Sequence, residues 1–100
     1  MQRSLDLLRA TGYTVAITEH FNAFSRTKND MFGWIDILAL KGNQTLAVQT
    51  TSRPNISTRV AKIAESDTVA AIRAAGWSIV VHGWDRGPDK KWRVRVVDLS

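Results

Sequence analysis

Apolar and polar residues alternate with two different periods along the chain, and the changes between these periods divide it into elements. Residues 3–11 carry apolar side chains at helical spacing, and Gly12 follows them as a residue that readily ends a helix. Residues 13–20 alternate instead, which predicts a strand whose apolar face ends in the carboxylate of Glu19. Residues 21–33 are polar and basic without a clear period, so they predict a long loop between strands.

The centre of the chain has the pattern of a hairpin. Residues 34–40 form a nearly continuous apolar run that only Asp36 interrupts. A turn signal at residues 41–44 leads into a second strand pattern at residues 45–51. We therefore expect two antiparallel strands in the middle of the fold.

The second half of the chain predicts helices and then two more strands. Ser57 can cap a helix, and a second helix can begin near residue 66 and end at Gly76. Residues 77–84 have the composition of a buried strand, and residues 92–99 alternate. The predicted class is α/β, with a mixed central sheet of about five strands, because the middle helices are long enough to cross over between parallel strands.

Composition limits both the size and the chemistry of the protein. One hundred residues with 44% hydrophobic content suffice for one core, so we expect a single domain over residues 1–100. The sequence has no cysteine and only two histidines, which leaves oxygen as the main source of metal ligands. A sparse oxygen site suits a hard cation such as Mg²⁺ or Mn²⁺, because water and substrate phosphate complete its coordination.

The net charge indicates which class of partner the protein binds. Fourteen Lys and Arg residues against nine Asp and Glu give a net charge of +5, which favours a polyanion such as DNA. No apolar run reaches the roughly 20 residues that span a bilayer, and the first residues lack the apolar stretch of a signal peptide. We therefore expect a cytoplasmic protein without a membrane partner. A chain this small gains stability from a partner subunit, so a homodimer is one form to test.

Asp36 needs an explanation because it interrupts an apolar strand pattern. Burying a carboxylate is costly unless the group is paired or bound to a cation. One interpretation places Asp36 near a strand end, half exposed or hydrogen-bonded to the backbone, and another places a cation beside it. On the partner strand, Gln49 and Thr51 share one face because strand side chains alternate. An acid, an amide and a hydroxyl are expected to converge across the hairpin.

These residues resemble the motif of the PD-(D/E)XK nucleases, in which one strand supplies an Asp and the next supplies an acid, any residue and a Lys. Asp36 matches the Asp, Gln49 the acid position and Thr51 the Lys position. Residues 28–36 and 76–84 are similar to segments of small phage-type members that resemble Holliday junction resolvases. The resemblance implies a restriction-endonuclease-like fold and a metal-dependent DNA endonuclease that hydrolyses phosphodiester bonds, with a possible preference for branched substrates.

Two departures from that motif leave the activity open. Gln49 is neutral where the family has a metal-binding carboxylate, and Thr51 cannot replace the Lys cation. In an active site, the resemblance implies that Asp36 and the Gln49 oxygen hold the metal. Glu19, at the end of the apolar face of the first predicted strand, is our candidate to restore the missing charge. A solvated carboxylate at a strand end is the alternative interpretation of Glu19. Weaker candidates for the same role are Asp6 and Asp30.

Basic residues around the hairpin are the candidates for the remaining roles. Lys28 is the nearest replacement for the lost catalytic cation, and Thr51 would then position water. A solvated loop lysine is the alternative interpretation of Lys28. Residues of the loop and of the following helix can meet a phosphate backbone, although an ordinary solvated surface explains them equally well. The predicted nucleic-acid-binding residues are Arg26, Lys28, Arg53, Arg59 and Lys62.

Three functions therefore remain open. The first is a metal-dependent DNA endonuclease, and the second is a nuclease-fold module that binds nucleic acid without cleaving it. The third is an assembly protein that pairs through the alternating strand at residues 92–99. His82 is expected to be packed and hydrogen-bonded rather than catalytic. Trp84 is the tryptophan expected to be exposed for stacking, whereas Trp92 is expected in the core.

Overall fold

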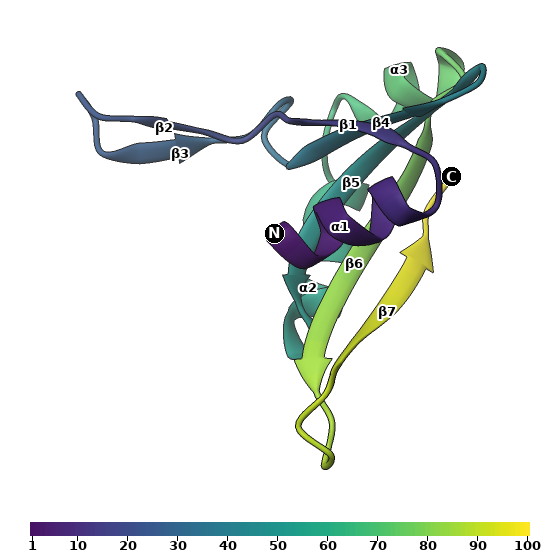
Figure 1. The fold of residues 1–100 in the computed structure, drawn as a ribbon. Coiled ribbons are helices and arrows are strands. Elements are labelled where there is room, and N and C mark those ends of the chain that lie inside the picture. The colour runs from purple at the N-terminus through teal and green to yellow at the C-terminus, as the bar shows by residue number, and fades with distance from the viewer.

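The computed structural model describes residues 1–27 and 29–100, and a five-stranded mixed sheet forms its centre (Figure 1). The strand order is β1-β4-β5-β6-β7, and every neighbouring pair is antiparallel except β5 and β6. This sheet confirms the predicted α/β class. The strands are β1 (Thr14–Ile17), β4 (Ile37–Lys41), β5 (Gln44–Ser52), β6 (Ser78–Arg86) and β7 (Trp92–Asp98).

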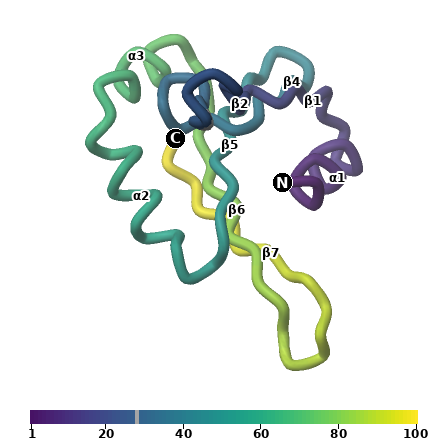
Figure 2. The backbone as a smooth tube through the Cα atoms, turned by 90° about the vertical axis from the view of Figure 1, so that its left-hand side faces the viewer, coloured from purple at the N-terminus to yellow at the C-terminus, as the bar shows by residue number. Residues whose placement is uncertain are grey.

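Helices cover both faces of this sheet, as Figure 2 shows. α1 (Gln2–Ala10) lies on one face, where Leu5 and Leu8 pack against apolar side chains of β4 and β5. α1 ends as predicted, since Gly12 takes a positive φ of 96° just beyond it. The opposite face carries the 3₁₀ turn η1 (Arg53–Asn55), α2 (Ile56–Ala64) and α3 (Val69–Ala74).

The second group of helices is the crossover that parallel pairing of β5 with β6 requires. Ile56 and Ile63 of α2 and Ile72 of α3 are buried in one cluster with Ile79 and other residues of the sheet. Burial of each such side chain stabilises the fold by about 1.5–3 kcal/mol. None of the helices in the described part of the chain is long and apolar enough to cross a membrane.

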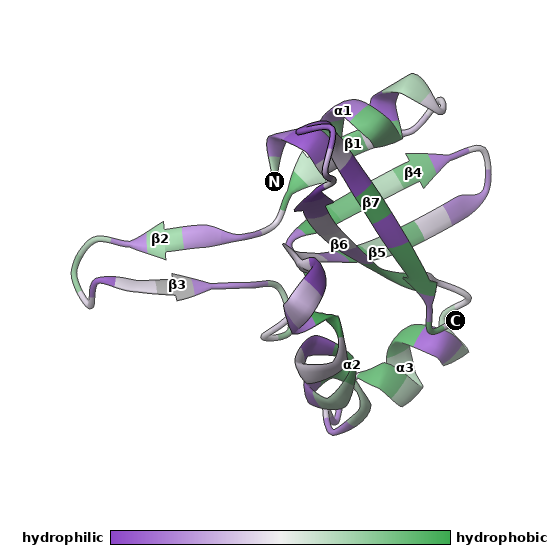
Figure 3. Cartoon of the chain, turned by 90° about the horizontal axis from the view of Figure 1, so that it is seen from below, coloured by the Kyte–Doolittle hydropathy of each residue, from purple (hydrophilic) through white to green (hydrophobic). Residues whose placement is uncertain are grey.

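A protruding hairpin replaces the loop that was predicted over residues 21–33. β2 (His20–Asn22) and β3 (Thr27–Asn29) pair in antiparallel fashion and stand away from the sheet as an arm (Figures 1 and 3). Oδ1 of Asn22 accepts hydrogen bonds from the backbone N–H groups of Phe24 and Ser25 at 2.9 and 3.3 Å, which organises the turn at the tip. The prediction was wrong because this hairpin satisfies backbone groups without burying an apolar face.

The arm also shortens the first predicted strand. β1 ends at Ile17 rather than His20, because the residues that follow Thr18 leave the sheet to form the arm. Thr18 keeps contact with the sheet through its N–H, which donates to the carbonyl oxygen of Asp36 at 2.9 Å. Ile17 is 57% exposed, so the apolar face expected for this strand is not buried to its end.

Other predictions need smaller corrections. Trp34 is buried, as a core residue should be, but it lies in a turn rather than in β4. Ser57 lies inside the first turn of α2, and Asn55 occupies the N-cap position without a side-chain capping bond. The expected exposures of two tryptophans are reversed, since Trp92 is 45% exposed whereas Trp84 is partly buried and donates a hydrogen bond to Ser4.

Candidate metal and phosphate site

Asp36 lies where β4 and β5 begin to separate, just before the first residue of β4. Its backbone N–H still donates to the carbonyl oxygen of Val48 at 2.9 Å, so the residue is held like part of the strand. The residue is only 4% exposed. Oδ2 accepts bonds from the Thr50 N–H at 2.8 Å, the Thr50 hydroxyl at 3.2 Å and Nε2 of Gln49 at 2.7 Å. The carboxylate is therefore fixed firmly by β5.

Two further carboxylates meet Asp36 at the base of the arm. Glu19 immediately precedes β2 and Asp30 immediately follows β3, so pairing of the arm brings these two residues together. One carboxylate oxygen from each of Glu19, Asp30 and Asp36 lies within 4.8 Å of the others. Asp6, the other weaker candidate, lies on the exposed part of α1 and accepts a bond from Gln2 instead.

Crowding of acids in a buried place changes the ionisation of Asp36. Burial is the main reason that the pKa of Asp36 is raised from 3.8 to about 6. Hydrogen bonds from Thr50 lower this pKa, while the negative charge of Asp30 raises it. Burial and Asp30 both disfavour the negative charge of ionised Asp36, and a cation beside these carboxylates would compensate that charge.

Gln49 contributes a free acceptor to this region. Its Oε1 is buried and has no hydrogen-bond partner among the residues that the structure describes. A buried polar atom without a partner costs about 1–3 kcal/mol, so such an atom indicates a missing ligand or water. The three carboxylates supply oxygen donors of the kind that Mg²⁺ and Mn²⁺ prefer, and Gln49 lines the same cavity with an amide that can add another. The residues present therefore fit a hard divalent cation.

A cavity of about 430 Å³ opens over these groups. Arg59, on α2, is the only Lys or Arg among the described residues that line it. Its guanidinium brings positive charge to a place where the acids would otherwise repel a phosphate. The lining residues are Met1, Glu19, Asp30, Asp36, Gln49, Thr50 and Arg59.

The structure separates Thr51 from this cavity. Thr51 lines a neighbouring groove of about 250 Å³ together with Trp84 and Trp92. Thr50, which the motif treats as its variable position, contacts Asp36 instead. The sequence pattern correctly joined Gln49 to Asp36, but it overlooked the bonds from Thr50.

The remaining basic candidates lie at varied distances from the acids. Arg26 is exposed in the turn at the tip of the arm, and Lys62 is exposed on α2. The predicted roles of Lys28 lie outside the described residues. Arg53 lies in the crossover, where its Nη1 is 3.7 Å from a carboxylate oxygen of Asp85.

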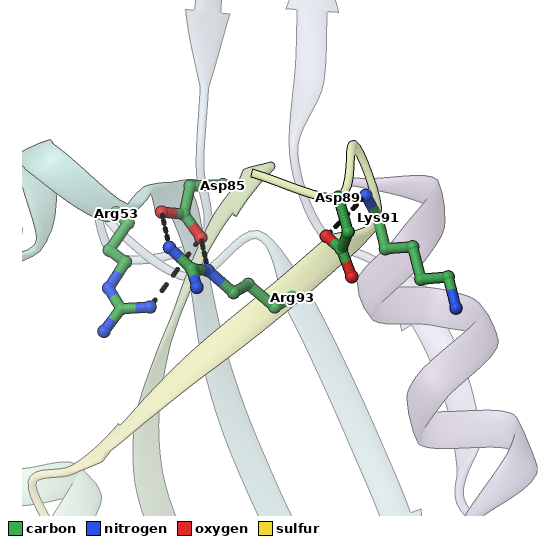
Figure 4. A network of polar contacts seen from close by, with 5 residues as sticks. All are labelled: Arg53, Asp85, Asp89, Lys91 and Arg93. Atoms are coloured by element: carbon green, nitrogen blue, oxygen red, sulfur yellow. Dashed lines mark hydrogen bonds and ion pairs between the residues drawn. The ribbon is translucent and has the colours of Figure 1, made fainter. Parts of the chain in front are cut away.

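Asp85 joins Arg53 to Arg93 in a small surface network, drawn in Figure 4. Nε and Nη2 of Arg93 donate to the two carboxylate oxygens of Asp85 at 2.9 and 3.3 Å. These bonds lower the pKa of Asp85, and Asp85 in turn raises the pKa of Arg93. Part of the charge of Arg53 is therefore balanced within the protein, which weakens it as a phosphate ligand.

A second buried polar group joins α1 to β6. Ser4 and His82 are both buried, and Oγ of Ser4 lies 3.0 Å from Nδ1 of His82. Nε1 of Trp84 donates to the same Oγ at 2.8 Å. Burial lowers the pKa of His82, which favours its neutral form. The group is a packed anchor for α1, as the sequence indicated for His82.

The strand order and the helical crossover give the chain a restriction-endonuclease-like α/β fold, with a group of acids at the edge of two central strands. Among solved structures, the chain is similar to Hjc of Archaeoglobus fulgidus, a Holliday junction resolvase from an archaeal hyperthermophile. The TM-score is 0.54 at 19% sequence identity, and the match covers 99% of this chain and 88% of that chain. No protein-family model matches the chain, and no curated protein does. The resemblance found in the sequence is thus confirmed at the level of the fold.

Proposed function

We propose that the protein is a metal-dependent DNA endonuclease that hydrolyses phosphodiester bonds, with a preference for branched DNA. The observation that carries the proposal is the cavity that combines an acidic cluster, one guanidinium and Gln49, whose buried amide oxygen has no partner among the described residues. A net charge of +5 supports a polyanionic substrate. The fold shared with a Holliday junction resolvase supports the preference for branched DNA.

The residues of the cavity divide into metal ligands and a phosphate ligand. Asp36, Glu19 and Oε1 of Gln49 would hold Mg²⁺ or Mn²⁺, with Asp30 as a further carboxylate. The bound cation would supply the positive charge that polarises a scissile phosphate. Hydrogen bonds from β5 keep Oδ2 of Asp36 in place, so its other oxygen is presented in a fixed position. Arg59 would bind the non-bridging oxygens of the phosphate.

The surface around the cavity would extend this contact along the nucleic acid. Arg26, Arg53 and Lys62 would meet phosphates on either side of the cleaved one, each contributing to affinity rather than to sequence recognition. A homodimer would present two cavities, which suits a substrate with two strands to cut. Lys28 keeps its predicted role as an additional phosphate contact from the arm.

A cleavage assay with an isosteric variant tests the proposal. Labelled duplex, single-stranded and four-way-junction DNA are incubated with the wild type in Mg²⁺ or Mn²⁺. Asp36→Asn should abolish cleavage, because it removes a ligand charge while keeping the shape of the side chain. Asp6→Asn makes the same charge change on the exposed part of α1 and should cleave like the wild type. Equal cleavage by Asp36→Asn would contradict the proposal and indicate a contaminating nuclease.

A second candidate is a nuclease-fold module that binds nucleic acid without cleaving it. The observation in its favour is that Thr51 and Gln49 stand where the motif has a Lys and an acid. This module would show salt-dependent DNA binding and no cleavage of any of the three substrates. The same assay therefore distinguishes the two functions, provided that binding is measured alongside it.

A further inference from the structure

The arm presents aromatic side chains that the rest of the chain does not cover. Phe24 at its tip is fully exposed, at 103%, and Phe21 in the middle of β2 is 59% exposed. The tip is nevertheless ordered by the bonds to Asn22 and by strand pairing. An ordered projection with exposed aromatic rings is typical of an interaction surface.

An apolar groove large enough for a phenyl ring lies beside Phe32, which follows the base of the arm. The groove has a volume of about 170 Å³, and apolar side chains form most of its lining. An apolar cavity of about 150 Å³ is large enough to bind benzene, so this groove can accept a phenyl ring. Phe32, three residues beyond the end of β3, forms one wall and is itself 53% exposed. The remaining lining residues are Thr68, Ala71, Ile72, Ala75 and Trp77.

We propose that this groove binds Phe24 from the arm of a second copy of the chain. Phe24 lies at the tip of the arm, whereas Phe32, one wall of the groove, follows the base of the arm. When two arms run side by side in opposite directions, the tip of each therefore reaches the groove of the other. A twofold axis at the middle of the arms then generates both contacts at once and closes the dimer. This axis passes near Phe21, which gives its exposed ring a partner in the other copy.

Charge favours this occupant as well. Residues 20–29 contain Arg26 and Lys28 and no acidic residue. The turn between α2 and α3 carries Glu65 and Asp67, both exposed, immediately before the Thr68 that lines the groove. A phenyl ring entering the groove would thus bring the basic tip of one arm to the acidic turn of the other copy. Opposite charges at such a rim steer association and fix its register.

The contact would also act on the acidic cluster. Glu19 and Asp30 flank the arm, so docking of the arm holds two of the three carboxylates in their relative positions. The dimer does not depend on nuclease activity, and its test uses no substrate. Its failure would remove the paired cavities but leave the proposed metal-dependent cleavage untouched.

Sedimentation equilibrium provides the first test. The wild type should form dimers, and Phe24→Ser should raise the dissociation constant roughly tenfold or more, as loss of a buried aromatic anchor does. Phe24 is fully exposed in the single chain, so the substitution should leave folding intact. Val96→Ser, a change at a 51% exposed position of β7, is the matched control and should dimerise normally. A wild type that stays monomeric, or a Phe24→Ser dimer of normal strength, would overturn the proposal.

Disulfide trapping provides a second test. The sequence has no native cysteine, so only the introduced cysteines can form a disulfide. Phe24→Cys and Ala71→Cys proteins are mixed under mild oxidation, and a covalent heterodimer is expected because the two sulfur atoms would meet in the groove. Phe24→Cys mixed with Asp89→Cys, in the turn between β6 and β7, is the control. Equal linkage in both mixtures would refute the contact. If the wild type is monomeric and Phe24→Ser instead weakens DNA binding, the arm serves nucleic acid and the dimer proposal falls.

Discussion

Nε2 of Gln49 lies 2.7 Å from Oδ2 of Asp36, and this bond determines how the amide of Gln49 is used. Because the nitrogen donates to the carboxylate, Oε1 is left as the acceptor without a described partner. A glutamate in the same place could not donate to Asp36 and would add a second negative charge beside it. The amide therefore stabilises the metal-free site and leaves one neutral ligand for a cation.

Gln49→Glu should lower the stability of the metal-free protein and raise its affinity for a divalent cation. The variant restores the acid of the motif, so we expect tighter binding of Mg²⁺ or Mn²⁺ and a larger rise in melting temperature when either is added. Without divalent cations it should melt below the wild type, because two adjacent carboxylates repel. Thermal unfolding with EDTA and with increasing Mn²⁺ measures both effects. A variant that gains no additional stabilisation from Mn²⁺ would show that Gln49 does not contribute a ligand.

The raised pKa of Asp36 predicts how stability depends on pH in the absence of metal. The folded-state pKa of about 6 exceeds the unfolded value of 3.8, so the folded protein holds the proton more tightly. The associated stability is complete below pH 3.8 and is lost as the pH rises through 6. A shift of this size corresponds to about 2–3 kcal/mol. Asp36→Asn should therefore gain stability relative to the wild type between pH 4 and pH 7, the interval that spans the shift.

Denaturant unfolding in EDTA at several pH values measures this difference. His82 acts in the opposite direction, since burial lowers its pKa and its contribution to stability grows as the pH rises. Both proteins contain His82, so its effect cancels when the two curves are subtracted. Two curves that run parallel from pH 4 to pH 7 would show that Asp36 does not titrate in this interval.

Arg59 should matter more to cleavage than any other basic residue of α2. Arg59→Ala should lower the cleavage rate roughly 100-fold, the effect expected for loss of one preorganised group that stabilises transition-state charge. Arg59→Lys keeps the charge but not the paired donors, so it should recover only part of the rate. Lys62→Ala, on the exposed part of the same helix, is the control and should weaken binding slightly. Equal losses for the two alanine variants would reduce Arg59 to a general phosphate contact.

The elements that bury apolar side chains could be predicted from sequence, and the arm could not. The hairpin of β4 and β5 and the crossover to β6 follow from runs that alternate or repeat at helical spacing. β2 and β3 pair without an apolar face, so no pattern of hydropathy marks them. The acidic cluster depends on this pairing, because only a closed arm brings Asp30 to Glu19.

The candidate site was predictable in part for a similar reason. Alternation on β5 correctly placed Gln49 on the face that meets Asp36. Thr51 shares that face but lies about 7 Å further along the strand, beyond the point where the cavity ends. Arg59 belongs to α2, within the crossover, and its place beside the acids depends on how α2 packs on the sheet.

Gly83 and Ile56 allow a direct test of that packing. A Cβ at position 83 would overlap the side chain of Ile56, which is buried where α2 begins. Gly83→Ala should therefore destabilise the protein by about 1–3 kcal/mol and move α2 away from β6. Because α2 carries Arg59, cleavage should fall together with stability. The double variant Gly83→Ala, Ile56→Ala frees the space for the added Cβ. Its loss in free energy of unfolding should therefore be smaller than the sum of the losses of the two single variants, which a double-mutant cycle in denaturant measures. Simple additivity of the two losses would mean that the helix does not approach the strand this closely.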